Sequence, residues 1–350
     1  MRRMDKIRRW AAGLCAAALV CGGGLWLYGR SAARREANST LFTMNTVATH
    51  RAWGPKARQA VEAVDAMLAA YEDEFSMYRP SSDIARINAA AGQAAVAVSP
   101  GTYELLEKAK ALSAANPHEF ALTIGPLTSA WGVSTPTPRV VPPEERARLL
   151  ALVDDGGLIL ENGTAKLARE GQAIDLGGIA KGAACGRARE IYDALGVKSA
   201  LLEIGGNVYA RGRKPDGTQF RVGFRDPAGT AQTAIAAISL EDQVIAVSGG
   251  YERYFEVDGV RYAHIFDPDT GAPAESDILS VGVIHSDGAT ADFYSTALYV
   301  GGMEKALAYM KQGGLALALD EKGELYVSRA LESTFAWVEG YEAQYTLHWV

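Results

Sequence analysis

The chain has 350 residues, of which 48% are hydrophobic and 22% are charged, and its formal net charge is -6 at pH 7. These values exclude a disordered, collagen-like or coiled-coil chain and indicate a globular protein with a sizeable core. The net negative charge disfavours nucleic acid as a partner, because a phosphate backbone needs a basic binding face. Two of the three cysteines, Cys15 and Cys21, lie in an apolar N-terminal run. Cys185 alone remains for the folded part, which excludes an internal disulfide and a four-cysteine zinc site there.

The N-terminus has the pattern of a membrane-targeting segment. Five basic residues and one acidic residue among the first nine precede twenty uncharged residues from Trp10 to Gly29. A helix of this length spans about 30 Å, the thickness of a bilayer core. The segment is an uncleaved anchor, a signal peptide cleaved near Ser31-Ala32-Ala33, or a site of lipid attachment through Cys21. Each interpretation places the rest of the chain outside the cytoplasm, on the periplasmic side and anchored to or exported across the inner membrane.

The charge divides unevenly along the chain. Residues 1–35, the basic flank and the signal or anchor helix, contain eight basic residues and one acidic residue, a net charge of +7. Residues 36–350, which we expect to form a single domain, contain 27 basic and 40 acidic residues, a net charge of -13. An acidic domain attracts an anionic ligand only through local groups such as a metal ion, a lysine or helix N–H groups.

The first half of this domain alternates extended and helical patterns. Residues 41–50 predict a strand, and residues 57–74 predict an amphipathic helix. Ser82 is a typical N-cap for a short helix through Ile87. Pro100 and Pro143 occupy positions that favour the first turns of two further helices.

The second half mixes hairpins and helices. Asn162-Gly163 and Asp258-Gly259 each separate two extended segments, which predicts antiparallel hairpins. Helices are expected over residues 179–195 and 289–300. Because no strand is followed by a GxGxxG or Walker sequence, the usual dinucleotide folds are disfavoured. We therefore expect an α+β fold, a single large domain with mixed, largely antiparallel sheets flanked by helices.

The segment IDLGGIAKG, from Ile174 to Gly182, joins a short extended piece to a helix through two glycines. Glycines let a ligand approach the backbone, a helix N-terminus presents free N–H groups, and Lys181 lies in the first turn. This pattern favours an anion site. Asp175 can accept a hydrogen bond from a ribose or a ring N–H. The alternative is a glycine-rich strand-to-helix turn with a solvated Lys181.

Asp292 and Thr296 are four residues apart on a predicted helix, so their side-chain oxygens share one face. Two hard oxygen ligands with this spacing suit magnesium, which commonly bridges a protein to a phosphate. The alternative is that Asp292 caps the N-terminus of its helix.

His264 ends a predicted strand and precedes a turn in which Asp267 can form an Asx-turn. Its titration range suits a general base or a phosphate contact, with a structural role as the alternative. The segment from Ser248 to Tyr254 resembles a phosphate-cradling loop, a Ser-Gly-Gly sequence followed by Arg253. We interpret Ser248 first as a loop hydroxyl and second as a ligand contact.

Two aromatic segments complete the set. Tyr78 and Arg79 suit ring stacking and a phosphate contact, and a second segment runs from Phe120 to Trp131-Gly132. The alternative for both segments is a structural role in the core and in turns.

In chain order, these segments resemble the flavin transferase (ApbE) family over roughly residues 41 to 328. The matching segments are Met44-Asn45-Thr46, FSMYRPSSDIARIN from Phe75, FALTIGPL with WG from Phe120, IDLGGIAKG from Ile174, LLEIGGNV from Leu201, VSGGYERYF from Val247, HIFDPDTG from His264 and ATADFYSTALYVGG from Ala289. Enzymes of this family lie in the bacterial periplasm or on the outer cell surface. With magnesium they cleave FAD and transfer its FMN part, through a phosphoester bond, to a Thr or Ser of a partner protein. Some members also hydrolyse FAD to FMN and AMP.

The resemblance implies FAD as substrate and Mg2+ as cofactor. It implies as partner an acceptor protein with an Asp-x-x-Ser/Thr-Gly-Ala-Thr/Ser motif, such as an electron-transport or sodium-pump subunit. His264 would be the base that activates the acceptor hydroxyl, and Asp292 the second catalytic residue. The metal ligands would be the Gly178 carbonyl, the Asp292 carboxylate and the Thr296 hydroxyl. The FAD site would be lined by Met44, Tyr78, Phe120, Ala121, Asp175, Lys181 and Ile265.

Four positions depart from the family pattern. Asn45 replaces the usual Gly of Met-Gly-Thr, and Ala121 replaces an Asp, a change that affects one adenine or ribose contact. Cys185 and Gly250 also stand where the family often has Asp. A flavin-binding protein without transfer, or an FAD pyrophosphatase, is therefore the alternative to an FAD:protein FMN transferase.

Overall fold

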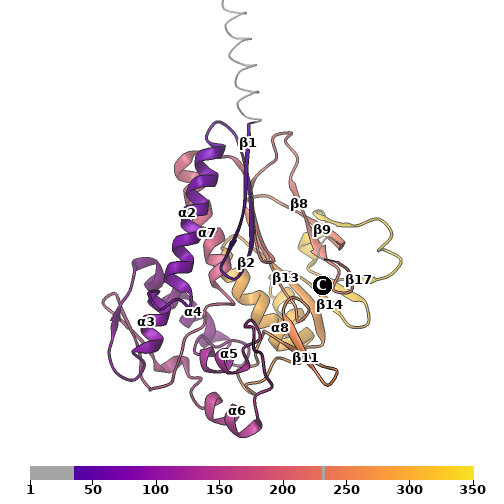
Figure 1. The fold of residues 1–350 in the computed structure, drawn as a ribbon. Coiled ribbons are helices and arrows are strands. Elements are labelled where there is room, and N and C mark those ends of the chain that lie inside the picture. The colour runs from indigo at the N-terminus through magenta and orange to yellow at the C-terminus, as the bar shows by residue number, and fades with distance from the viewer. Residues whose placement is uncertain (1–34, 231–232) are drawn as a thin grey trace, which may run out of the picture.

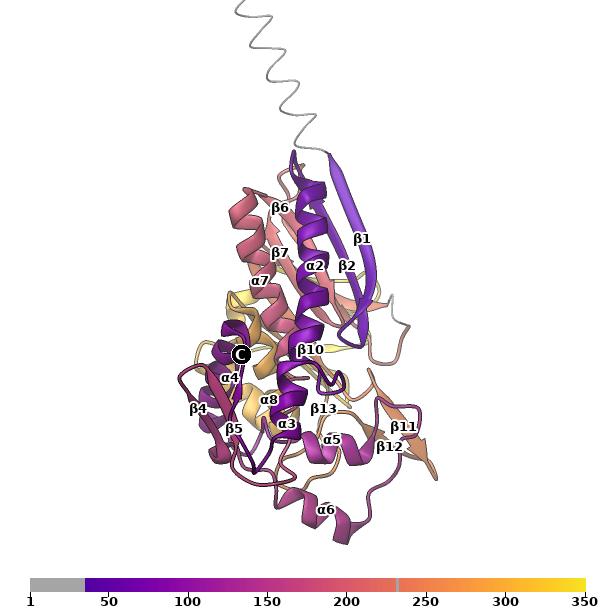
Figure 2. The ribbon, with the colours of Figure 1, turned by 60° about the vertical axis from the view of Figure 1, so that its left-hand side comes forward.

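A nine-stranded sheet runs through the protein in the computed structural model, which describes residues 35–230 and 233–350 (Figures 1 and 2). In spatial order its strands are β1 (Glu36–Thr43), β2 (Thr46–Trp53), β6 (Ser199–Ile204), β7 (Asn207–Gly212), β10 (Gln243–Ser248), β13 (Ile278–His285), β14 (Leu315–Asp320), β15 (Glu324–Val327) and β17 (Thr346–Trp349). Neighbouring strands are antiparallel except β15 and β17.

Three smaller sheets accompany it. One has the order β3 (Val96–Ala97), β5 (Thr164–Leu167), β4 (Leu158–Glu161), and a second has the order β16 (Phe335–Trp337), β9 (Ala234–Leu240), β8 (Phe220–Arg225). The third is the hairpin of β11 (Tyr254–Val257) and β12 (Val260–Ala263). The hairpins predicted at Asn162-Gly163 and Asp258-Gly259 are thereby confirmed.

The seven α-helices of the described part are α2 (Ala57–Phe75), α3 (Asp83–Ala89), α4 (Pro100–Ala115), α5 (Gly125–Trp131), α6 (Pro143–Leu150), α7 (Ala180–Leu195) and α8 (Gly288–Lys311). Helices α2, α7 and α8 cover one face of the large sheet (Figures 1 and 2). The small sheet β16-β9-β8 packs on the opposite face through residues such as Phe224 and Ile238. The α+β class with largely antiparallel sheets is confirmed.

Local sequence explains several of these elements. Helix α2 buries Val61, Val64 and Leu68, whose spacing of three and four residues forms one apolar face. The Ser82 hydroxyl accepts a hydrogen bond from Ala85 N at 3.0 Å and caps α3. Ser99 caps α4 in the same way, with Pro100 in the first turn.

The single strand expected over residues 41–50 is wrong. The segment contains the end of β1, a turn and the start of β2, and Thr43 pairs with Thr46 across the turn. Met44 and Asn45 reverse the chain with φ of 49° and 56°. Two successive residues with positive φ are typical of a type I′ hairpin turn, and Met-Asn is a weak signal for it because it contains no glycine.

Helix α8 is longer than the predicted range of residues 289–300, and it is broken at Gly302, where φ is 73°. Its N-cap is Asp287, whose Oδ1 accepts a hydrogen bond from Thr290 N at 2.8 Å. The alternative that Asp292 caps this helix is therefore wrong, because Asp292 lies one turn inside it.

The predicted signal or anchor helix lies outside the described residues. Between residues 35 and 350, leaving aside positions 231–232, no helix is both long and apolar enough to cross a membrane.

Candidate active site

A cavity of about 560 Å³ opens where the β1–β2 turn, the start of α7, the middle of α8 and the segment after β12 meet. This volume is within the range of pockets for small molecules and cofactors. Asp292 is not part of the cavity wall and lies behind Lys181. The predicted site residues that line the cavity are Met44, Tyr78, Phe120, Ala121, Asp175, Gly178, Lys181, His264, Ile265 and Thr296.

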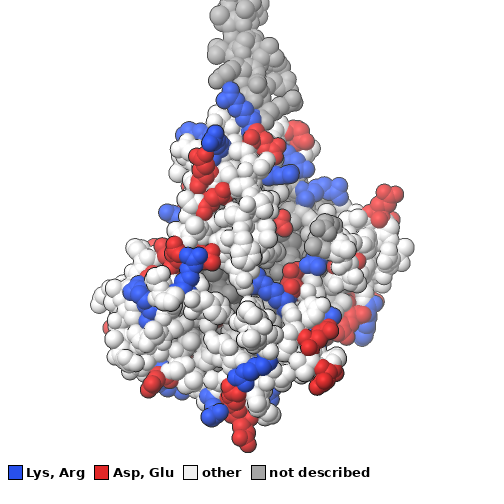
Figure 3. Space-filling model, in the orientation of Figure 1, with Lys and Arg blue, Asp and Glu red and all other residues white. Residues whose placement is uncertain are grey.

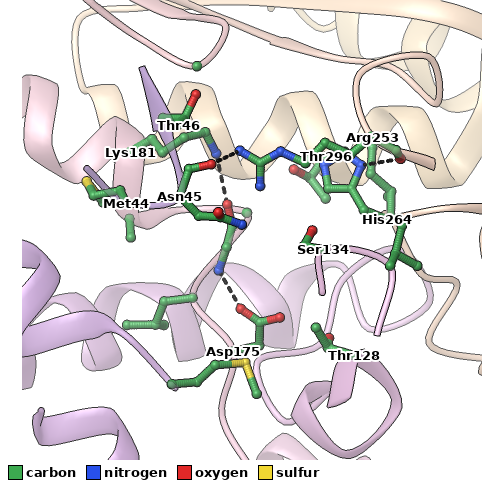
Figure 4. A pocket seen from close by; sticks show the side chains of 18 of the residues that line it. Met44, Asn45, Thr46, Thr128, Ser134, Asp175, Lys181, Arg253, His264 and Thr296 are labelled. Atoms are coloured by element: carbon green, nitrogen blue, oxygen red, sulfur yellow. Dashed lines mark hydrogen bonds between the residues drawn. The ribbon is translucent and has the colours of Figure 1, made fainter. Parts of the chain in front are cut away.

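The glycine-rich segment before α7 forms one wall of this cavity. Gly177 N donates a hydrogen bond to Asp175 Oδ1 at 2.8 Å, and Lys181 Nζ donates to Gly177 O at 2.9 Å (Figure 4). A Cβ atom at Gly178 would lie 2.8 Å from Cε2 of Phe120. Glycine is therefore required at position 178 for the Phe120 ring to pack against the backbone, and both residues reach the cavity.

Asp292 connects helices α7 and α8. Its Oδ2 accepts a hydrogen bond from Gly182 N at 2.9 Å, in the first turn of α7, and its Oδ1 lies 3.4 Å from Lys181 Nζ. The positive end of the α7 dipole stabilises a carboxylate at this position. Thr296 lies one turn further along α8, and its hydroxyl has no hydrogen-bond partner among the described residues. A Cβ at Gly178 would lie 3.1 Å from Thr296 Oγ1, so these two residues are neighbours.

This group of oxygens suits a hard cation. The Lys181 ammonium already lies against the Asp292 carboxylate and the Gly177 carbonyl, so these atoms form a local site that favours positive charge. Carboxylate, hydroxyl and backbone oxygens are the donors that magnesium prefers. Within the described residues, no three His, Cys, Asp or Glu side chains are placed together as metal ligands. A metal here would therefore depend on backbone, hydroxyl and ligand oxygens in addition to Asp292.

His264 follows β12 and its ring reaches the cavity (Figure 4). Its main-chain N donates to Arg253 O at 3.1 Å, and its Nδ1 lies 3.2 Å from the same oxygen. Because a carbonyl oxygen can only accept, this bond places the proton on Nδ1 and leaves a free lone pair on Nε2. Burial, followed by the positive charges of Arg253 and Lys181, lowers the pKa of His264 to about 4. The imidazole is therefore neutral at physiological pH and can accept a proton.

The structure adds residues to the cavity wall that were not among the predicted site residues. The Arg253 guanidinium reaches the cavity and donates to Asn45 O at 2.8 Å (Figure 4). Its position in the VSGGYERYF segment was the available signal. Thr128 and Ser134 also line the cavity, and no sequence pattern singled them out. Ser248 lines the cavity as the last residue of β10 and not as part of a loop, and its hydroxyl is hydrogen-bonded to Ser295 Oγ at 2.8 Å.

Solved structures with this fold are flavin transferases and related ApbE proteins. An ApbE protein from Thermotoga maritima matches with a TM-score of 0.79 at 32% identity, over 86% of this chain and 99% of that one. The flavin transferase ApbE from Vibrio cholerae matches with a TM-score of 0.77 at 27% identity, again over 86% and 99% of the two chains. The α+β fold is therefore that of ApbE proteins.

Sequence comparison agrees with the fold. A protein of Treponema pallidum named FAD:protein FMN transferase is 33% identical over 322 residues, which cover 87% of this chain and 88% of that protein. A protein of the same name from Klebsiella pneumoniae is 35% identical over 248 residues, covering 70% and 77%. The model of the ApbE family matches residues 41–319. The chain belongs to the ApbE family, as its ordered segments predicted, and it is an enzyme of the transferase class.

Proposed function

We propose that the protein is an FAD:protein FMN transferase, which transfers FMN from FAD to a Thr or Ser hydroxyl of a partner protein and releases AMP. The observation that carries the proposal is that a neutral His264 and Lys181, which pairs with Asp292 behind it, line one cavity. A base for a hydroxyl and groups for phosphate charge are the two requirements of phosphoryl transfer to an alcohol.

FAD is the proposed occupant of the cavity. Tyr78, whose surface is 56% exposed at the cavity wall, offers a ring face on which an aromatic ring system can stack. The Asp175 carboxylate can accept a hydrogen bond from a ring N–H or a ribose hydroxyl. Met44, Phe120 and Ile265 supply apolar contact area.

Magnesium is the proposed cofactor, held by the Gly178 carbonyl, the Asp292 carboxylate and the Thr296 hydroxyl. Bound there, it would neutralise negative charge on the phosphates. The hydrogen bond from Gly182 N fixes the Asp292 carboxylate, so this ligand does not have to be reoriented.

His264 is the proposed general base. As the acceptor oxygen attacks the phosphorus of the FMN part, Nε2 takes the proton of the acceptor hydroxyl. The bond between this phosphorus and the bridging oxygen breaks, and AMP leaves with the electron pair. The Arg253 carbonyl holds the Nδ1 proton throughout and stabilises the imidazolium that forms.

The proposed partner is a protein with the Asp-x-x-Ser/Thr-Gly-Ala-Thr/Ser motif, an electron-transport or sodium-pump subunit, on the extracytoplasmic side of the inner membrane. The location rests on the basic flank and the twenty uncharged residues from Trp10 to Gly29. In this arrangement the N-terminal segment keeps the enzyme on the membrane that holds its acceptor.

The test incubates the full-length protein in detergent with FAD, magnesium and an acceptor that carries this motif. We expect the intact mass of the acceptor to increase by one FMN group, with AMP released in equal amount. No adduct, on an acceptor that another enzyme modifies, would contradict the proposal. AMP release at full rate without acceptor would identify an FAD pyrophosphatase, and bound flavin without AMP would identify a flavin-binding protein.

A further inference from the structure

The charged residues that line the cavity differ in whether an opposite charge neutralises them. Five of the seven have such a partner within 4 Å: Glu72 and Arg79 pair with each other, Glu119 with Lys305, Lys181 with Asp292, and Glu252 with Arg225. Asp175 and Arg253 have no ion-pair partner among the described residues. They lie on opposite sides of the cavity (Figure 4). The cavity therefore has one unpaired negative side and one unpaired positive side.

Arg253 is a cation that has lost part of its hydration without gaining a counter-ion. Burial lowers the pKa of its guanidinium, although the group stays protonated. A guanidinium has five N–H donors, and the bond to Asn45 O is the single hydrogen bond that this side chain makes within the described residues. Its other donors remain available to a ligand in the cavity.

We infer that Arg253 binds the phosphate group that the reaction transfers, an inference that rests on the proposed FAD:protein FMN transferase activity. The planar fork of a guanidinium matches two phosphate oxygens. The bond to Asn45 O fixes one side of the fork, so the β1–β2 turn orients the group. The Arg253 carbonyl also holds the ring of His264, so one residue positions both the phosphate and the base.

The surface of the molecule does not supply the positive charge that would attract an anionic ligand. On the face in Figure 3, Lys and Arg side chains lie interspersed with Asp and Glu, without a broad basic area. Because residues 36–350 carry a net charge of -13, an anionic ligand is attracted by individual side chains within the cavity. Arg253 supplies such a charge without an ion-pair partner among the described residues, because the adjacent Glu252 carboxylate pairs with Arg225.

The test compares flavins with and without phosphate on the full-length protein in detergent. Riboflavin, FMN and FAD are titrated, and affinity is followed by the quenching of flavin fluorescence. In Arg253→Gln we expect affinity for FMN and FAD to fall about 10- to 100-fold, the usual range for charge-assisted hydrogen bonds, while riboflavin affinity changes less than about twofold. The affinity of Arg253→Lys for FMN and FAD should lie between those of the wild type and Arg253→Gln, because lysine keeps the charge and lacks the planar fork.

Arg261→Gln is the matched control. Arg261 lies on β12, in the hairpin that Arg253 precedes, pairs with Glu256, packs on the Tyr254 ring and does not line the cavity. This variant should bind all three flavins like the wild type. An equal loss for riboflavin and FMN in Arg253→Gln would show a structural effect and overturn the inference, as would no loss for either. If the wild type binds FMN through Arg253 but modifies no acceptor, the proposed function fails, and the part of the inference that remains is that Arg253 binds the phosphate of a flavin.

Discussion

At the scale of single residues, the site depends on protonation states that the surrounding protein fixes. His264 keeps an accessible Nε2 while burial and two neighbouring cations prevent it from taking a proton in the resting enzyme. In the resting enzyme, His264 is therefore a weak base. During attack on the phosphorus, the acceptor hydroxyl gives its proton to Nε2, and the Arg253 carbonyl stabilises the charged ring that forms.

We expect His264→Gln to lower the rate of FMN transfer by about 10²- to 10⁴-fold, because it removes the base. FAD affinity should change little, since both side chains are uncharged near neutral pH. Protonation of His264 should not lower the wild-type rate of FMN transfer between pH 7.5 and 5, because the pKa of His264 is about 4 and the neutral form persists above that pH. His118→Gln, at an exposed residue that contacts Asp269, is the control. A rate profile in which His264 titrates near 6.5 would contradict this prediction.

Asp292 provides a second test at this scale. In Asp292→Asn, the amide oxygen can still accept the bond from Gly182 N, so the contact between α7 and α8 is kept while the charge is lost. We expect magnesium affinity, measured by calorimetry, to fall at least about tenfold and the transfer rate to need correspondingly more magnesium. Thr296→Ser keeps the hydroxyl and should retain wild-type affinity. Equal magnesium affinity in Asp292→Asn and wild type would show that the metal binds elsewhere.

At the scale of elements, the site depends on how closely α7 and α8 approach each other. A Cβ at Gly182 would lie 2.1 Å from Gly288 O and 2.6 Å from Cβ of Asp292, and a Cβ at Gly288 would lie 2.2 Å from Gly182 O. Neither position can carry a side chain unless the helices separate. Their contact is what brings the Asp292 carboxylate to the N-terminus of α7.

Gly182→Ala should therefore separate the two helices. We expect it to lower the free energy of unfolding by about 1 to 3 kcal/mol or more, as for other overpacked sites, and to weaken magnesium binding because Asp292 moves away from Gly178. Urea unfolding and calorimetry measure the two effects.

Gly186→Ala is the matched control, because it is one turn later in α7 with no atom within 4 Å of the new Cβ. It should stabilise the protein by about 0.5 to 1 kcal/mol and leave magnesium binding unchanged. Equal changes in the free energy of unfolding and in magnesium affinity in Gly182→Ala and Gly186→Ala would show that the site does not depend on the close approach of α7 and α8.

The elements also show what the sequence could and could not predict. The caps at Ser82 and Ser99 and the hairpin at Asn162-Gly163 depend on neighbouring residues, so local patterns were sufficient. The turn at Met44 was missed because its positive φ is imposed by the pairing of β1 with β2 and not by a glycine. All the predicted site residues except Asp292 line one cavity, and their roles there stay predictions. The sequence indicated Arg253 only as the arginine after a phosphate-cradling loop, because its lack of an ion-pair partner depends on residues far apart in the chain.

At the scale of the whole molecule, the central strands of the large sheet are covered by helices on one face and by the β16-β9-β8 sheet on the other, and polar side chains are buried there as well. His50, on β2, is fully buried beneath α7, and its Nε2 lies 2.6 Å from the Tyr192 hydroxyl. Its Nδ1 has no hydrogen-bond partner among the described residues. Burial lowers the pKa of His50 to about 4 from a usual value of 6.5. The fold therefore holds a neutral imidazole at the centre of its helix-to-sheet interface.

This lowered pKa makes the stability of the fold depend on acid. Below pH 6.5 the unfolded chain protonates His50 and the folded chain does not, so stability falls as pH decreases from 6.5 to about 4. The contribution of His50 to this loss at pH 4.5 is about 2 to 3 kcal/mol.

The variant His50→Gln tests this contribution, because its side-chain amide can still hydrogen-bond to the Tyr192 hydroxyl but cannot titrate. Urea unfolding at pH 7 and 4.5 should therefore show a pH-dependent loss that is smaller in His50→Gln by this amount. His118→Gln, at an exposed histidine, should lose stability like the wild type. If His50→Gln and wild type lose stability equally between the two pH values, His50 does not control the acid sensitivity of the fold.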